Sequence, residues 1–253
     1  MGNWATADQV WACALVFIRV GAIAVLLPGV GETAVPPRIR LTFAFLLALV
    51  LTPVVADKLP ALPGSVGAMG GWVLKETLTG IVIGAVLRMM LAALAVAGEI
   101  VSLQTTLSFA QTANPLQAQP GTTLASFLTI LGLTLVFATG LHRMFIGAIF
   151  NSFDLFAPAK ALMVGDAAQL IVKTVGQAFA TGVQLAAPVM VFSLVFNAAT
   201  GLVGRVMPQF QVFFAATPLN VLMGLAIFAV SLGTVGLVWI ARYQDLVALF
   251  MRA

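Results

Sequence analysis

Long runs of apolar residues, separated by short stretches rich in proline, glycine and charge, dominate the pattern along the chain. A helix needs about 20 residues to cross the hydrocarbon layer of a membrane. The pattern predicts about six such helices, at residues 10–28, 39–56, 72–98, 123–150, 174–204 and 211–241. Strands of a membrane barrel would alternate polar and apolar residues over about 10 positions. Since no stretch alternates persistently, the expected fold class is all-α.

The connectors between these segments differ in character. Pro36 and Pro37 cannot continue a helix, so residues 28–40 are predicted to form a stiff turn with a new helix starting at Arg38. Residues 58–71 form a Pro/Gly linker, residues 106–123 are polar without one charge, and residues 153–166 are predicted to be a partly amphipathic loop. A short hairpin turn is predicted at residues 204–210 and includes Arg205, Pro208 and Gln209.

Composition supports a membrane protein. Apolar residues make up 61% of the 253 and charged residues 8%, and mean hydropathy is +1.10, whereas soluble domains are about 45–50% apolar and about 25% charged. We therefore expect one polytopic membrane domain over residues 1–253, with lipid as its surroundings. Residues 1–9 carry no Lys or Arg, so the first apolar segment is interpreted as a retained helix and not as a signal peptide.

Several function classes find no support in the residues. The 12 basic residues are scattered, and a nucleic-acid partner is not expected because no basic run could follow a phosphate backbone. Cys13 and His142 are the only residues of their kinds, so neither a metal site nor a cofactor is expected. No catalytic motif is present, and the chain is not expected to be an enzyme. By the positive-inside rule, 7 basic residues against 3 place both termini in the cytoplasm.

Charged residues within the apolar segments are the most informative polar positions. Arg19 and Arg88 lie inside segments, and Glu76 and Glu99 lie near segment ends. A charge at the bilayer centre costs about 2.5–3.5 kcal/mol, so these side chains should face protein or water. Two alternatives stay open, which are pairing across subunits and pairing within the chain, for example of Arg88 with a glutamate on a neighbouring helix. The sequence favours the second.

Small residues at helical spacing predict close helix contacts. The pairs are Gly80/Gly84, Gly201/Gly204 and Gly233/Gly236.

Five blocks of sequence resemble one known family, in the family's order. They are FIRVGAIAVLLPGVGETAVPPRIRLTFAFLLAL (17–49), KETLTGIVIGAVLR (75–88), AGEIVSLQTTLSFAQTANP (97–115), TGLHRMFIGAIFNSF (139–153) and GLVGRVMPQFQVFFAATPLNVLMG (201–224). Together they are similar to the FliR family of flagellar export proteins, whose injectisome counterpart is SctT. The chain departs from the family pattern at Pro37, a second proline, and at Thr105-Thr106, where the family has Met-Gly.

The resemblance implies a structural subunit of a type III protein-export gate in the bacterial inner membrane, part of the pore for unfolded flagellar proteins. Residues 1–173 would play a FliP-like part, and residues 174–253 would form a FliQ-like hairpin with kinks at Pro188 and Pro218. Implied partners are FliP-like and FliQ-like subunits, FlhB- and FlhA-like export components, exported unfolded proteins and membrane lipid. The alternatives are a small-solute channel or secondary transporter, for which an internal repeat is missing, and an intramembrane enzyme.

The resemblance also places site residues. Residues 106–123 would plug the pore, although an ordinary surface loop is the simpler interpretation of the residues alone. The plug residues are Phe109, Gln111, Asn114, Pro115, Gln117, Gln119, Pro120 and Gly121. The expected buried charges and subunit contacts are Arg19, Arg38, Arg40, Glu76, Arg88 and Glu99.

Overall fold

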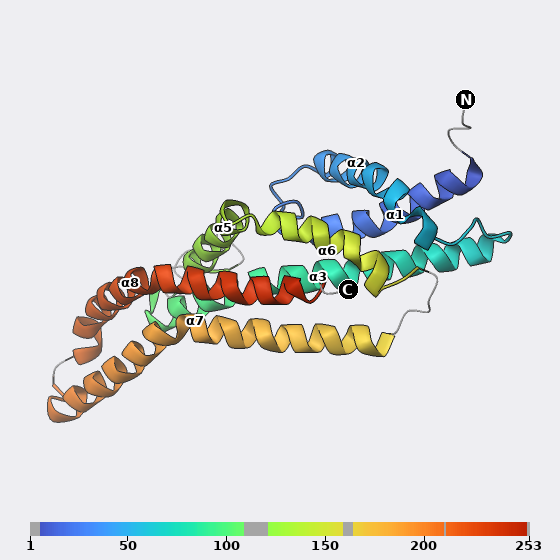
Figure 1. Cartoon of the computed structure of the whole chain (residues 1–253). Coiled ribbons are helices and arrows are strands. Elements are labelled where there is room, and N and C mark those ends of the chain that lie inside the picture. Colours follow the sequence, from blue (N-terminus) through green and yellow to red (C-terminus); the bar gives the residue numbers. More distant parts are fainter. Residues whose placement is uncertain (1–5, 109–120, 159–163, 210, 252–253) are drawn as a thin grey trace. The chain divides into compact units, whose positions relative to one another are not determined.

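The computed structural model describes residues 6–108, 121–158, 164–209 and 211–251. Within these ranges the chain folds into helices and contains no strand, which confirms the all-α expectation. In chain order the helices are α1 (Ala7–Leu26), α2 (Pro37–Val55), the 3-10 helix η1 (Ala56–Lys58), α3 (Val66–Gln104), α5 (Thr123–Ala138), α6 (Leu141–Leu155), α7 (Val164–Val206) and α8 (Val212–Ala248) (Figure 1).

Local sequence explains where the first two helices begin. Thr6 caps α1 through a reciprocal pair of hydrogen bonds with Gln9, the arrangement that satisfies free N–H groups at a helix start. Pro37 occupies the first turn of α2, where its missing N–H costs nothing. The predicted helix start at Arg38 is therefore correct to within one residue.

Among the residues that the structure describes, five helices are long and apolar enough to cross a membrane, or up to six if a bent pair is counted as one span. They correspond to five of the six predicted segments. The sixth, residues 123–150, was predicted as one helix and is two, α5 and α6, which meet at an angle of 76°. Gly140 adopts φ +75° between them, a conformation that glycine tolerates and other residues rarely do. The predicted loop at 153–166 is also wrong at its end, because α7 already begins at Val164.

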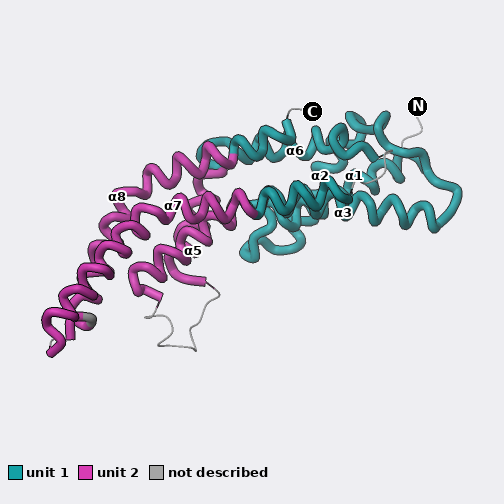
Figure 2. The backbone as a smooth tube through the Cα atoms, turned by 90° about the horizontal axis from the view of Figure 1, so that it is seen from below, with its two compact units in different colours: residues 1–90, 137–175, 244–253 teal, residues 91–136, 176–243 magenta. Residues whose placement is uncertain are grey.

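The chain divides into two compact units, each built from separate stretches of sequence (Figure 2). Unit 1 contains Met1–Met90, Phe137–Val175 and Gln244–Ala253, and unit 2 contains Leu91–Val136 and Gly176–Tyr243. The FliP-like part at residues 1–173 and the FliQ-like hairpin at residues 174–253 are roles within the family. The division into units does not test these roles, so they stay a prediction.

In unit 1, α3 crosses α1 at the predicted glycine pair. A Cβ atom on Gly80 would lie 2.6 Å from the carbonyl oxygen of Arg19, and one on Gly84 would lie 2.9 Å from the Cβ of Leu26. Both contacts are closer than side chains allow, so the two glycines permit the helix backbones to approach.

In unit 2, α3 crosses α5 at Gly98, where an added Cβ would lie 2.4 Å from the Cα of Ala125. It crosses α7 at Gly182, where an added Cβ would lie 2.9 Å from the Ala93 carbonyl oxygen. The other two predicted pairs do not mark such close helix contacts. Among the described residues, no atom lies within 4 Å of a Cβ added to Gly201, Gly204 or Gly233.

Candidate functional site

The C-terminal end of α6 is the centre of the main polar cluster in unit 1. The last carbonyl groups of a helix are left with free acceptor capacity, and here Arg19 of α1 uses it, adding a bond to the Ser152 carbonyl, which already accepts the Phe156 N–H. Its Nη1 donates to the Ser152 carbonyl at 2.8 Å, and its Nη2 donates to the Phe156 carbonyl at 2.9 Å. The arginine inside the first apolar segment therefore caps another helix.

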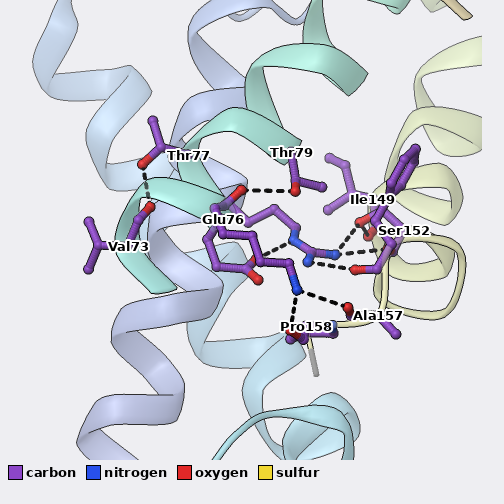
Figure 3. Close-up of polar contacts among 11 residues, drawn as sticks. Val73, Glu76, Thr77, Thr79, Ile149, Ser152, Ala157 and Pro158 are labelled. Carbon is purple, nitrogen blue, oxygen red and sulfur yellow. Dashed lines mark hydrogen bonds and ion pairs between the residues drawn. The ribbon is translucent and has the colours of Figure 1, made fainter. Parts of the chain in front are cut away.

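Glu76 of α3 balances the charge of this arginine. Arg19 Nε donates to Glu76 Oε2 at 2.5 Å, and both side chains are completely buried. The guanidinium also lies 4.2 Å from the centre of the Phe153 ring. Figure 3 shows Glu76 and Ser152 on opposite sides of the cluster. Glu76 Oε1 has no hydrogen-bond partner among the residues that the structure describes, so one carboxylate oxygen is buried there without compensation.

Two lysines extend the cluster along the end of α6. Lys75 Nζ donates to the carbonyl groups of Ala157 and Pro158, which follow the helix. Lys58, in η1, forms an ion pair with Asp154 at 2.7 Å. Cations near a helix C-terminus interact favourably with its partial negative charge. We call Arg19, Lys58, Lys75 and Glu76 the α6 clasp, because together they fasten the end of this helix to α1, η1 and α3.

A second ion pair in unit 1 holds the turn between α1 and α2. Arg88 of α3 pairs with Glu32 at 3.2 Å. Arg40 donates to the carbonyl groups of Val30, Glu32 and Val35, so the turn is bound from two sides. Both intramembrane arginines are thus paired within the chain, although the partner of Arg88 lies in a connector and not on a helix.

Unit 2 contains two anchors at the ends of the uncharged connector. Glu99 Oε1 accepts a hydrogen bond from the Thr122 N–H at 2.8 Å, and Thr122 Oγ1 accepts one from the Ala125 N–H at 3.2 Å. A carboxylate at a helix N-terminus interacts favourably with the helix dipole. Gly121, the last residue of the predicted plug list, precedes this cap with φ +93°.

The other anchor is the C-terminal end of α3. The Gln104 carbonyl accepts hydrogen bonds from Ser193 Oγ of α7 and Asn220 Nδ2 of α8, both at 3.2 Å. Thr106, two residues further, has φ +60°, which is strained for a β-branched residue. This is the position where the family pattern has glycine, and the strain follows from that departure.

The remaining predicted site residues contribute less to these clusters. Residues 109–120 lie outside the described residues, so the structure does not place the predicted plug. Arg38, Arg205, Pro208 and Gln209 are exposed, and their roles as contacts or turn residues stay predictions. Sequence reasoning missed the structural use of Lys58, Lys75, Ser193 and Asn220. The lysines were counted only for orientation, and single polar residues in apolar helices gave no pairing signal.

The ion pairs and hydrogen bonds of these clusters hold helices and turns in place. Each cation of these clusters is matched by a carboxylate or by carbonyl groups of a helix end or turn. Among the described residues no group of His, Cys, Asp and Glu could hold a metal ion. Each cluster joins elements that are far apart in the sequence, as Arg19 joins α1 to α3 and α6.

Comparison with known proteins agrees with the resemblance described above. The family model "Bacterial export proteins, family 1" matches residues 10–246. The chain is 54% identical to "Flagellar biosynthetic protein FliR" of Caulobacter vibrioides, over 99% of this chain and 100% of the relative. It is 29% identical to the proteins of the same name from Bacillus subtilis, over 87% of this chain and 86% of the relative, and Escherichia coli, over 84% and 80%. The chain therefore belongs to family 1 of the bacterial export proteins.

Proposed function

We propose that this chain is a structural subunit of the flagellar type III protein-export gate and forms part of the pore for unfolded flagellar proteins. The observation that carries the proposal is the full-length similarity to a flagellar biosynthetic protein at 54% identity. The proposed location is the bacterial inner membrane, with both termini in the cytoplasm, and the chain performs no catalysis itself.

The polar clusters support a structural role. The α6 clasp and the hydrogen bonds of Ser193 and Asn220 to the end of α3 use buried polar groups to hold helix ends against other helices. Burying such groups is costly unless they are paired, and here their hydrogen bonds fix the positions of helices. Rigid positioning of helices is what a pore wall requires.

The proposed partners are FliP-like and FliQ-like membrane subunits, with FlhB- and FlhA-like export components. Residues 106–123 are proposed as the plug of the pore. Support comes from the two anchors in unit 2, since Glu99 holds residue 122 and Ser193 holds residue 104. A segment whose ends are both fixed can return to one position after a substrate has passed.

Deleting the gene in its own bacterium tests the proposed function. We expect hook and filament proteins to disappear from outside the cell, and the intact gene on a plasmid to restore them. Inner-membrane proteins and general secretion, measured in the same cells, are the controls and should not change. Normal export of filament protein in the deletion strain would contradict the proposal.

A further inference from the structure

The turn between α1 and α2, in unit 1, is surrounded by arginines from three helices. Arg40 of α2 donates to carbonyl groups of the turn, and Arg88 of α3 pairs with its Glu32. The start of α6 is close to the same turn, because a Cβ added to Gly29 would lie 2.7 Å from Phe137 Cζ, shortly before α6 (Figure 1). We call the four arginines of this region the arginine cluster; they are Arg38, Arg40, Arg88 and Arg143.

Two members of the cluster have no carboxylate to balance them. Arg38 and Arg143 are exposed, and neither forms an ion pair with any residue that the structure describes. His142, next to Arg143, packs on the Phe137 ring at 5.5 Å between ring centres. Its Nδ1 is buried and has no hydrogen-bond partner in the described ranges. This region therefore has more positive charge than the chain itself neutralises.

The position of the two free arginines on their helices increases this excess. Both lie in the first turn of a helix, where free N–H groups already make the helix end positive. The cap residues, Pro36 of α2 and Gly140 of α6, form no side-chain cap, and neither first turn contains an acidic residue. An anion bound here would interact favourably with the arginines and with both helix ends.

The turn also lies at the level where a membrane presents anions. It joins two helices of membrane length, since α1 has 20 residues and α2 with η1 has 22, both strongly apolar. Helices of about 20 residues extend from one face of the hydrocarbon layer to the other. The turn between them is therefore at the height of the lipid headgroups, where basic residues between membrane helices bind anionic lipids.

An exposed apolar track continues from the arginine cluster along α2. Leu41, Phe45 and Leu49 follow Arg38 at spacings of three and four residues, which places them on the same side of the helix. They are 60%, 48% and 47% exposed. From Arg38 to Leu49 the track is about 16 Å long, close to half of the hydrocarbon layer of about 30 Å. A cation above an apolar track of this length matches the two parts of a phospholipid.

We propose that the arginine cluster binds an anionic phospholipid, with the phosphate held by Arg38 and Arg143 and an acyl chain lying along Leu41, Phe45 and Leu49. Arg40 and Arg88 hold the turn in place and add to the attraction. An acidic protein segment would match the charge but not the apolar track, so the two features together favour lipid. The inference needs the membrane-length helices only and does not depend on the export function.

Quenching by brominated lipid measures which phospholipid lies along α2. The full chain, with Cys13→Ser and a fluorescent label at Leu46→Cys, is placed with its co-purifying proteins in vesicles of phosphatidylcholine and phosphatidylglycerol. One of the two lipids at a time carries bromine on its acyl chains. We expect phosphatidylglycerol to be preferred by about thirtyfold, since two exposed arginines attract it. A label at Val230→Cys, on the exposed face of α8, is the control and should show no preference.

Variants test the two arginines directly. Arg38→Gln with Arg143→Gln should lower the preference at the Leu46 label to that at the Val230 label. Arg38→Lys with Arg143→Lys keeps the charge and should retain most of the preference. Arg205→Gln is the matched control, because Arg205 is an exposed arginine in the last turn of α7, where positive charge is favourable. It should leave the preference unchanged.

Each alternative occupant gives a different result. Equal quenching by the two lipids at Leu46 would overturn the inference. So would a preference that inorganic phosphate abolishes and sodium chloride of equal ionic strength does not, because the cluster would then bind a free anion. A photo-crosslinker at Ala138, which is exposed shortly before α6, should form lipid adducts in cells. Adducts there with an acidic protein segment alone would show that protein covers the cluster. Failure of the proposed export function would leave the lipid preference intact.

Discussion

Arg19 illustrates how a single charged residue is accommodated in an apolar helix. Its guanidinium bonds one carboxylate oxygen and two carbonyl groups, and it lies over an aromatic ring. Replacing a buried ion pair by apolar residues is often neutral, whereas removing one partner is strongly destabilising. The value of Arg19 to the fold therefore depends on Glu76 and on the end of α6 together.

Arg19→Met should destabilise the chain by about 3–5 kcal/mol, because it leaves Glu76 buried and unpaired. The double variant Arg19→Met with Glu76→Met should recover most of this loss, except for the hydrogen bonds at the end of α6, worth about 1 kcal/mol each. Unfolding in detergent with increasing dodecyl sulfate measures both. Arg88→Met is the control, since its pair with Glu32 is partly exposed and should cost about 0–1 kcal/mol. Equal losses for Arg19→Met and Arg88→Met would contradict this account.

Thr106→Gly should stabilise the chain by about 1 kcal/mol, because glycine adopts φ +60° without strain. Thr105→Gly, one residue earlier, should destabilise it. Thr105 Oγ1 bonds the Val101 carbonyl, and its methyl group packs against Gly224. The thermal midpoints of the two variants in detergent should therefore move in opposite directions. A fall in the midpoint of Thr106→Gly would show that the strain is offset by contacts of the threonine.

At the residue scale the sequence indicated which side chains matter but not their partners. Arg19, Glu76, Arg88 and Glu99 stood out because charge in an apolar segment is costly. Two of the partners of Arg19 are main-chain carbonyl groups, which every residue has and which sequence therefore cannot single out. Arg88 was expected to pair with a helix residue, and its partner, Glu32, lies in a turn whose position depends on tertiary packing.

At the scale of elements, hydropathy found the helices but not the bend between α5 and α6. A run of apolar residues indicates burial, but it does not show whether the helix axis changes direction. Residues 123–150 therefore resembled one straight span. Gly140 within the window was a signal of a break, and its φ of +75° shows why glycine is there. Helix ends in the connectors, such as the start of α7 at Val164, were missed because their residues are not strongly apolar.

The crossing of α3 and α1 gives a sharp test of one helix contact. Gly80→Leu should destabilise the chain by about 1–3 kcal/mol, because the side chain would overlap the backbone of α1. Gly70→Leu, in the same helix, meets nothing within 4 Å and should be neutral or stabilising. The comparison uses dodecyl sulfate unfolding of both variants. Equal midpoints for the two would show that α1 and α3 are not in close contact at Gly80.

The uncharged connector gives a test at the same scale. Deleting Ala110–Pro120 should increase leakage of ions or small solutes through an assembled gate, because a plug of this kind blocks the pore when no substrate is present. Dye influx and export are measured together in cells that carry the remaining components. Deletion of Pro60–Gly64, in the linker before α3, is the control for shortening a loop. Unchanged permeability in a gate shown to be assembled would mean that residues 110–120 do not close it.

At the scale of the whole molecule, the two compact units interleave along the chain. Unit 1 takes three stretches and unit 2 takes two, so neither unit is a continuous piece of sequence. The sequence predicted one membrane domain but not this division into two units. The division depends on which helices, far apart in the sequence, contact each other. Long helices such as α3 and α7 contribute residues to both units, so the boundary between the units falls inside helices and not in connectors.

The chain expressed alone should be unstable or aggregated, and co-expression with FliP-like and FliQ-like subunits should stabilise it. The most apolar windows of α2 and α8 are only 22% buried, and Val230 of α8 is 87% exposed. Lipid can cover such apolar faces, but exposed amide side chains such as Gln184 and Asn197 of α7 need hydrogen-bonding partners that acyl chains do not offer. Size-exclusion profiles in mild detergent and the half-life of the chain in the membrane measure the effect, with an unrelated membrane protein co-expressed as the control. A monodisperse monomer that persists equally well without its partners would show that the exposed helices of this chain need lipid alone.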